Sequence, residues 1–251
     1  MSKDRTPVIV SAARTAIGSF DGTLAKTPAT DLGAVAIRAA VERAGIDPGT
    51  IDEVFMGSVV PAGLGQAPAR QASIKAGIPA HVGAVTLNKV CGSGLKTAMM
   101  AAGLVKAGDG DIYVAGGMEN MNMAPYLLQQ GRTGYRLGHA QVLDACVHDG
   151  LWCAFEDQHM GLAAEWIAEE YGVSREEQDQ FALGSQQKAV AAQEAGCFLD
   201  EIVPVEIPQR RGDPLVFDVD ENPRKDSSME RLARLRPVFC LLYTSPSPRD
   251  C

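Results

Sequence analysis

The stretch NKVCGSGLKT, residues 88–97, places one cysteine among glycines directly before an apolar run. Gly92 and Gly94 carry no Cβ, so the backbone can turn sharply and a bulky group can approach the sulfur of Cys91 without a clash. The run that follows has the composition of a helix, and the backbone N–H groups at a helix N-terminus stabilise a thiolate. Taken alone, the stretch leaves two interpretations open, because Cys91 can be a nucleophile or a small buried residue at a strand-to-helix turn.

The sequence around this stretch predicts strands that alternate with helices. Helices are expected over residues 31–44, 68–76 and 94–106, and strands over residues 8–10, 53–60, 82–86 and 112–115. This alternation favours right-handed crossovers and an α/β fold with a mostly parallel sheet covered on both faces. The first helix is apolar on most sides, which predicts that it is buried between layers.

A second, less regular unit is expected after residue 120, where Met, Pro, Gly and Tyr accumulate. Ser174 and Glu177, three residues apart, have the pattern of a capping box and predict the first turn of a polar helix. The other elements expected in this unit are a helix over residues 160–171 and short strands over residues 202–207 and 215–219.

Composition argues against several classes of protein. The chain has 23 basic and 31 acidic residues, a net charge of −8, and no run of Lys or Arg exceeds two residues, which argues against a nucleic-acid partner. No apolar run approaches the roughly 18 residues of a membrane span, and residues 1–7 are too short and polar for a signal peptide. The six cysteines form no CxxC pair, which argues against zinc and disulfides. We therefore expect a cytoplasmic protein without a metal or a membrane partner.

The segment CLLYTSPSPRDC, residues 240–251, differs in character from the rest of the chain. It has no hydrophobic period and contains two Ser-Pro steps. All but its last residue resemble one reading frame of a transposon adapter used to prepare sequencing libraries. We therefore expect an adapter-derived artefact and leave the segment out of the fold prediction. The alternative is a disordered tail.

Several stretches together resemble the thiolase family in its order and spacing. They are SAARTAIGSF, GLGQAPARQA, NKVCGSGLKT, VAGGMENMNMAPY and HMGLAAEW. The resemblance covers about residues 7–239 and implies a layered αβαβα sandwich, of which this chain is similar to the N-terminal half with an inserted loop domain. The implied division is a thiolase α/β domain over residues 1–120 and the inserted loop domain, with coenzyme A-binding residues, over residues 121–239.

The resemblance also implies a reaction in which Cys91 attacks an acyl-CoA thioester and holds the acyl group. In short-chain members a second acetyl-CoA then gives acetoacetyl-CoA by Claisen condensation, and the reverse reaction is thiolytic cleavage, with ping-pong kinetics. The backbone N–H of Cys91 would stabilise the developing oxyanion. Coenzyme A thioesters are thus expected as substrates, with no permanently bound cofactor.

Five residues match by position those that line the coenzyme A pocket in this family: Leu151, His159, Met160, Arg224 and Phe239. The permanent charge of Arg224 suits nucleotide phosphates. The residues alone leave a solvated or otherwise satisfied histidine open as the alternative for His159. The HMG form of the motif is typical of members that form acetoacetyl-CoA.

Two further features concern the pocket and the assembly. Arg231 stands where many members of the family have a small polar residue, so the pocket differs there in detail. Residues 125–138 resemble the loop through which family members form tetramers, and a homotetramer is therefore expected at full length. The Met and Tyr content of this loop could equally cover the surface of its own subunit.

The family's second half carries a Gly-His-Pro histidine, an Asn-Glu-Ala-Phe asparagine and a Cys-Gly-Gly-Gly cysteine, and none of these motifs occurs in this sequence. The chain as written is therefore expected to be nearly inactive. Three hypotheses remain: a truncated thiolase, an inactive fragment that binds coenzyme A or a partner chain, and a related condensing enzyme such as a ketoacyl synthase. Within the family, a longer-chain 3-ketoacyl-CoA thiolase is the alternative.

Overall fold

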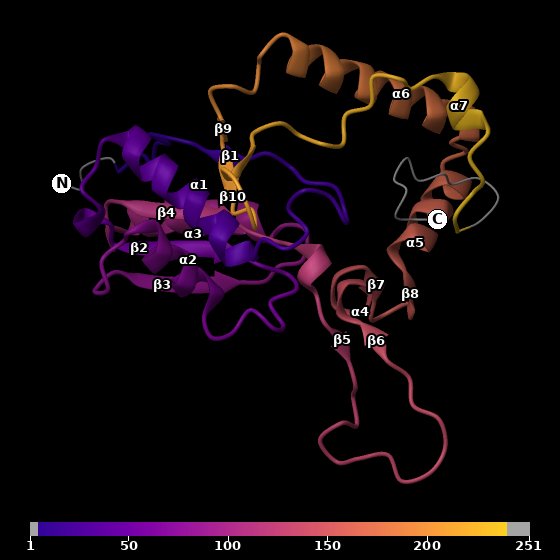
Figure 1. The fold of residues 1–251 in the computed structure, drawn as a ribbon, viewed down its shortest axis with the longest axis horizontal. Coiled ribbons are helices and arrows are strands. Elements are labelled where there is room, and N and C mark those ends of the chain that lie inside the picture. Colours follow the sequence, from indigo (N-terminus) through magenta and orange to yellow (C-terminus); the bar gives the residue numbers. More distant parts are fainter. Residues whose placement is uncertain (1–4, 240–251) are drawn as a thin grey trace. The chain divides into compact units, whose positions relative to one another are not determined.

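The computed structural model describes residues 5–239, which fall into two compact units (Figure 1). The adapter-like segment 240–251 lies outside the described residues. Of the described residues, unit 1 comprises 5–150 with Glu201–Val219, and unit 2 comprises Leu151–Asp200 with 220–239. The domain boundary expected after residue 120 stays a prediction.

Unit 1 is built on a three-stranded parallel sheet in the order β3-β2-β4. Its central strand β2 (Glu53–Gly57) pairs with β3 (Gly83–Leu87) on one side and with β4 (Tyr113–Gly117) on the other. The helices of this region are α1 (Ala29–Ala44), α2 (Pro68–Ala76) and α3 (Ser93–Ala107). The predicted alternation of helices with parallel strands is confirmed.

The side chains of β2 alternate between the two faces of the sheet, as the pleat requires. Val54 and Met56 are buried in a core with apolar side chains of α1 and α2. Gly57 faces the opposite side, where it lies against the first turn of α3. The sheet therefore has helices on both faces, as the sequence predicts.

The first turn of α3 lies in direct contact with the ends of two strands. A Cβ added to Gly57 would lie 2.7 Å from the Cβ of Ser93 and 2.9 Å from the backbone nitrogen of Gly94. The hydroxyl of Thr97, a fully buried residue, is hydrogen-bonded to the carbonyl oxygen of Gly116 in β4 at 3.0 Å. This close approach requires a residue without a side chain at position 57.

The rest of α3 is poorly covered in the described chain. Ser93 and Thr97 are the buried residues of this 15-residue helix. Leu95 is 72% exposed and Met99 is 55% exposed. A helix that is apolar on most sides is normally buried. The outer face of α3 is thus an apolar surface without a partner among residues 5–239.

Two strand predictions need correction. Residues 8–10 form no strand in the structure, and their side chains are 70–88% exposed. Their β-branched composition favours a strand only where a neighbouring strand pairs with them, and the described chain offers none. The strand predicted over residues 53–60 ends at Gly57, because the carboxylate of Glu119 takes up the N–H groups of Val59 and Val60.

The remaining strands of unit 1 pair two by two. They are β1 (Arg14–Thr15) with β9 (Ile202–Val203), β5 (Tyr126–Leu127) with β6 (Leu143–Asp144), and β10 (Val205–Ile207) with β11 (Leu215–Phe217). The expected strand over residues 202–207 is therefore split into β9 and β10. The short helix α4 (Ala145–Gly150) follows β6, and the 3-10 turns are η1 (Pro48–Thr50) and η2 (Met121–Met123).

Unit 2 is mainly helical, with α5 (Met160–Glu170), α6 (Arg175–Glu194) and α7 (Met229–Ala233). A two-stranded ribbon of β7 (Trp152–Cys153) and β8 (Gln158–His159) precedes α5. The predicted capping box at the start of α6 is confirmed: Ser174 and Glu177 each accept a hydrogen bond from the other's backbone N–H. The N–H and hydroxyl of Ser174 hold the pKa of Glu177 below its ordinary value. Across residues 5–239, no helix combines the length and the apolar character needed to span a membrane.

The close contact between Gly57 and the first turn of α3 leads to a prediction about stability. We expect Gly57→Ala to destabilise the protein by about 1–3 kcal/mol, because the new methyl group overlaps backbone and Cβ atoms of α3. Gly103→Ala in the same helix is the control, since a Cβ there meets nothing within 4 Å. Urea unfolding followed by circular dichroism measures both. Equal unfolding midpoints for the two variants would contradict the close packing described here.

Asp52 gives a prediction for pH dependence. Its carboxylate accepts hydrogen bonds from the N–H groups of Ile112 and Asp111 at 2.9 and 2.7 Å, and these bonds hold the pKa of Asp52 below its ordinary value, with Arg5 adding to the effect. A carboxyl group whose pKa is lowered in the folded state stabilises the fold above its unfolded pKa, about 3.9, and this stability is lost as the pH falls through the folded value.

Asp52→Asn should therefore lower the free energy of unfolding at pH 7, by less than about 1 kcal/mol because the side chain is exposed. The difference from the unmodified protein should shrink below about pH 4, where Asp52 takes up a proton first in the unfolded chain and, at lower pH, in the folded protein. Urea unfolding at a series of pH values between 7 and 3 provides the measurement. A difference that stays constant over this range would show that the charge of Asp52 has no part in stability.

Candidate functional site

Cys91 lies in the turn between β3 and α3, where Gly92 is the N-cap of the helix. The predicted position directly before a helix N-terminus is confirmed. The thiol-bearing residue is exposed, so the alternative of a small buried core residue is wrong for this chain. An exposed cysteine beside the first N–H groups of a helix has the surroundings of a reactive thiol.

The turn before Cys91 is held by side chains of its own sequence. Asn88 Oδ1 accepts a hydrogen bond from the N–H of Val90 at 2.9 Å, and Ser93 Oγ donates to the carbonyl of Val90 at 2.6 Å. Ser93 Oγ also accepts from the N–H of Lys89 at 2.8 Å. Val90 itself has a φ of 47°. A β-branched residue at positive φ breaks the usual preference, so no sequence pattern would have revealed it.

Four of the five residues predicted to line a coenzyme A pocket meet at the start of α5 in unit 2. The N–H of Met160 donates to the carbonyl of Leu151 at 2.9 Å. The ring of His159 stacks on the ring of Phe239, with centroids 4.6 Å apart and planes 25° from parallel. A Cβ at Gly161 would overlap the ring of Phe239, so the glycine of the HMG sequence makes room for it.

His159 is also the N-cap of α5. Its Nδ1 accepts a hydrogen bond from the N–H of Gly161 at 3.0 Å. Because a backbone donor occupies Nδ1, the proton of the neutral ring is assigned to Nε2. One ring nitrogen of His159 thus has a hydrogen-bond partner within the fold, in line with the alternative of a satisfied histidine. The Nε2–H group remains a hydrogen-bond donor.

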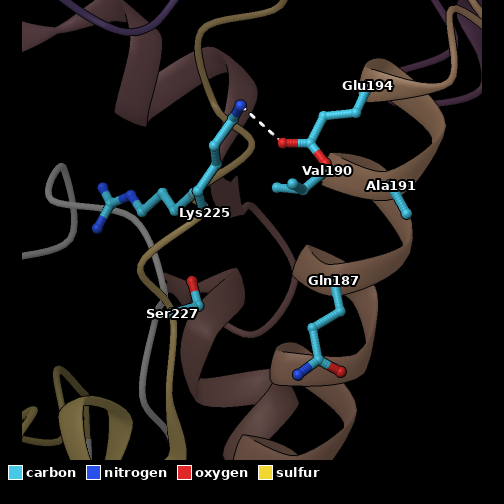
Figure 2. A pocket seen from close by; sticks show the side chains of 7 residues that line it. Gln187, Val190, Ala191, Glu194, Lys225 and Ser227 are labelled. Carbon is cyan, nitrogen blue, oxygen red and sulfur yellow. Dashed lines mark ion pairs between the residues drawn. The ribbon is translucent and has the colours of Figure 1, made fainter.

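Arg224, the fifth predicted residue, lines a separate cavity of about 220 Å³ beside α6. The residues around this cavity are Gln187, Val190, Ala191, Glu194, Arg224, Lys225 and Ser227. Figure 2 shows Lys225 reaching across to Glu194, an ion pair with a distance of 2.7 Å. The backbone N–H of Arg224 donates to the side chain of Gln186 at 2.7 Å, which fixes the chain at this point.

The sequence places Lys225 beside Arg224 in a short basic cluster that could meet a phosphate-bearing ligand, but it did not point to Ser227 or Glu194. Ser227 lies three residues further along and adds a hydroxyl to the same cavity, and Lys225 adds a second cation whose charge Glu194 offsets. Arg231, the residue that departs from the family pattern, is paired with Asp226 and does not line this cavity. An exposed guanidinium beside a hydroxyl group is suited to bind a phosphate. Among residues 5–239, no group of three or more His, Cys, Asp or Glu side chains is arranged to hold a metal ion.

The sequence matches a family model described as "Thiolase, N-terminal domain" over residues 7–241. It is 57% identical over 232 residues to an acetyl-CoA acetyltransferase of Pseudomonas aeruginosa and 57% identical over 232 residues to one of Cupriavidus necator. In each case the match covers 92% of this chain and 59% of the relative. The chain therefore spans somewhat more than half of the length of these curated relatives.

The structure is similar to a solved structure of an acetyl-CoA acetyltransferase from Syntrophomonas wolfei. The TM-score is 0.87 at 44% sequence identity, and the match covers 92% of this chain and 57% of that chain. The expected thiolase-like α/β fold is thereby confirmed. On the strength of the family model, which matches well over half of the sequence, this chain belongs to the thiolase family.

Proposed function

We propose that this chain is the acyl-accepting part of an acetyl-CoA acetyltransferase, with Cys91 as its nucleophile. The observation that carries the proposal is an exposed cysteine at the N-terminus of α3, in a chain 57% identical to proteins of that name. The thiolate of Cys91 attacks the thioester carbonyl of acetyl-CoA, the bond from carbonyl carbon to coenzyme A sulfur breaks, and coenzyme A leaves as a thiolate. The product is an acetyl thioester on Cys91.

The second half of the reaction consumes that thioester. A second acetyl-CoA loses an α-proton, its carbanion attacks the acetyl carbonyl on Cys91, and the Cys91 thiolate is released together with acetoacetyl-CoA. The reverse direction is thiolytic cleavage. The histidine and cysteine motifs that would move these protons are absent from the sequence. We therefore infer that the chain alone stops at the acetylated cysteine, without turnover.

Unit 2 supplies the binding of coenzyme A in this proposal. Arg224, with Ser227 beside it, would bind a phosphate of the nucleotide. The cluster of Leu151, His159, Met160 and Phe239 would contact the remainder of the molecule. Coenzyme A thioesters act as substrates, and no permanent cofactor takes part. The division at residue 120 into a catalytic α/β domain and an inserted binding domain belongs to the same proposal.

Assembly is part of the proposal as well. The loop between β5 and β6 exposes apolar side chains, with Leu137 100% and Val142 58% exposed, and this supports contact with a second copy in a homotetramer at full length. The uncovered outer face of α3, with Leu95 and Met99, would be buried by the part of the relatives that extends beyond the match. A cytoplasmic location fits a thiol nucleophile, because the cytosol keeps thiols reduced.

A second function is favoured by one observation. The sequence lacks all three motifs of the family's second half and spans 59% of its relatives. A fragment of this kind can bind coenzyme A or a partner chain without turning over substrate. The two proposals differ in whether acetyl-CoA leaves an acetyl group on Cys91.

Acetyl transfer to Cys91 is the test of the proposed function. After incubation with acetyl-CoA, mass spectrometry of the peptides should find one acetyl group on the peptide that contains residue 91. Cys91→Ala should abolish it, whereas Cys197→Ala, which removes another exposed cysteine, should leave it unchanged. No acetoacetyl-CoA should form. Binding of coenzyme A without acetylation would favour the non-catalytic fragment, and acetylation that survives in Cys91→Ala would refute the assignment of the nucleophile.

Coenzyme A affinity tests the role of Arg224. We expect Arg224→Ala to weaken the binding of coenzyme A by about tenfold or more, because a charge-assisted hydrogen bond to phosphate is lost. Arg210→Ala is the matched control, since it removes an exposed arginine that does not line the cavity. Isothermal titration calorimetry measures both. Equal affinity of the two variants would remove Arg224 from the binding site.

A further inference from the structure

Val90 has a backbone conformation that its own side chain does not explain. Its φ of 47° is in the left-handed region, which is costly for a β-branched residue. Its side chain is 51% exposed, so side-chain packing does not force the conformation. Another set of contacts must therefore hold Val90 in this state.

Two side chains bond to both sides of Val90. Ser93 Oγ donates to the carbonyl of Val90 at 2.6 Å and accepts from the N–H of the preceding residue, Lys89, at 2.8 Å. Asn88 Oδ1 accepts from the N–H of Val90 at 2.9 Å. Ser93 is itself fixed, because it is 4% exposed and lies against Gly57.

Asn88 also ties this turn to the neighbouring strand. Its Nδ2 donates to the carbonyl of Val59 at 3.2 Å, just beyond the end of β2. The N–H of Val59 in turn donates to the carboxylate of Glu119 at 2.6 Å. The turn is therefore anchored at both ends, by Asn88 to the sheet edge and by Ser93 to the sheet face.

Because Cys91 directly follows Val90, the φ and ψ angles of Val90 set the direction in which Cys91 leaves the turn. We propose that Ser93 and Asn88 are positioning residues: they hold Val90 in the left-handed conformation and thereby fix the place of Cys91 directly before Gly92, the N-cap of α3. The importance of this placement for catalysis rests on the proposed role of Cys91. Without the two side chains, only the backbone hydrogen bonds from the N–H of Gly92 to Lys89 and from the N–H of Ser93 to Val90 hold the turn. Val90 is then freer to leave the left-handed conformation, and the position of Cys91 changes with it.

The test uses the chain as it is and a reagent that needs no coenzyme A. The rate at which iodoacetamide modifies Cys91 at pH 7 is read by mass spectrometry of its peptide, with exposed Cys197 as the internal reference. We expect Ser93→Ala to lower the rate of modification of Cys91 by at least about fivefold and to leave the rate at Cys197 unchanged. Asn88→Ala removes an exposed side chain, so it should fold normally and slow Cys91 in the same direction.

The decisive comparison is made in a Val90→Gly background. Glycine adopts positive φ without cost, so the hydrogen bonds of Ser93 are no longer needed to hold the turn. In that background Ser93→Ala should lower the rate of Cys91 modification by less than about twofold. The effects of Val90→Gly and Ser93→Ala on this rate are thus strongly coupled. If Ser93 only stabilised the fold, its loss would have the same effect with valine or with glycine at position 90.

Ser73→Ala is the matched control for removing a buried serine hydroxyl. Ser73 is fully buried in α2, and its hydroxyl has no hydrogen-bond partner in the described structure. This variant should leave the rate at Cys91 unchanged. An unchanged rate in both Ser93→Ala and Asn88→Ala, or an equal loss for Ser93→Ala in both backgrounds, would overturn the proposal. A failure of acetyl transfer from acetyl-CoA, by contrast, would refute the proposed function and leave this result standing.

Discussion

The contact between the first turn of α3 and the ends of β2 and β4 is the constraint on which unit 1 depends. Backbone meets backbone there because Gly57 carries no Cβ: one added to Gly57 would lie 2.8 Å from the carbonyl carbon of Ser93 and 2.9 Å from the nitrogen of Gly94. Thr97 adds a buried hydrogen bond to β4. The seating of this turn fixes where α3 begins, and with it the place of Cys91 at the carboxyl edge of the parallel sheet, the edge at which α/β folds usually bind ligands.

Hydrogen bonds link the residues that follow the three strands at this edge of the sheet. Val59 follows β2, Asn88 follows β3 and Glu119 follows β4, and hydrogen bonds link Asn88 to Val59 and Val59 to Glu119. Residues far apart in the sequence thus form one network under the turn that carries Cys91. The network explains how an exposed turn keeps a costly conformation at Val90, because every strand end contributes to holding it.

Local signals were enough to predict most elements but not the contacts between them. Helix α2 has the predicted bounds, and the capping box of Ser174 and Glu177 is present, since both depend on neighbours in the sequence. Cys91 was placed correctly before α3 by its glycines. Residues 8–10 failed as a strand because pairing needs a distant partner. The resemblance to the thiolase family predicted that four residues share one site, and the structure places them together at the start of α5: Leu151, His159, Met160 and Phe239. The place of Ser227 beside Arg224 depends on tertiary geometry. The left-handed conformation of Val90 is held by its neighbours Asn88 and Ser93, but a β-branched residue gives no sign of it in the sequence.

Amide hydrogen exchange of the isolated chain, resolved by peptide, tests most directly whether α3 is held chiefly by its first turn. We expect strong protection in β2 and in α2, and weaker protection in the later turns of α3, where Met99 is exposed. Adding Gly57→Ala should extend the fast exchange to the first turn. Protection of the whole of α3 equal to that of β2 would contradict the account, because it would mean that another surface already covers the helix.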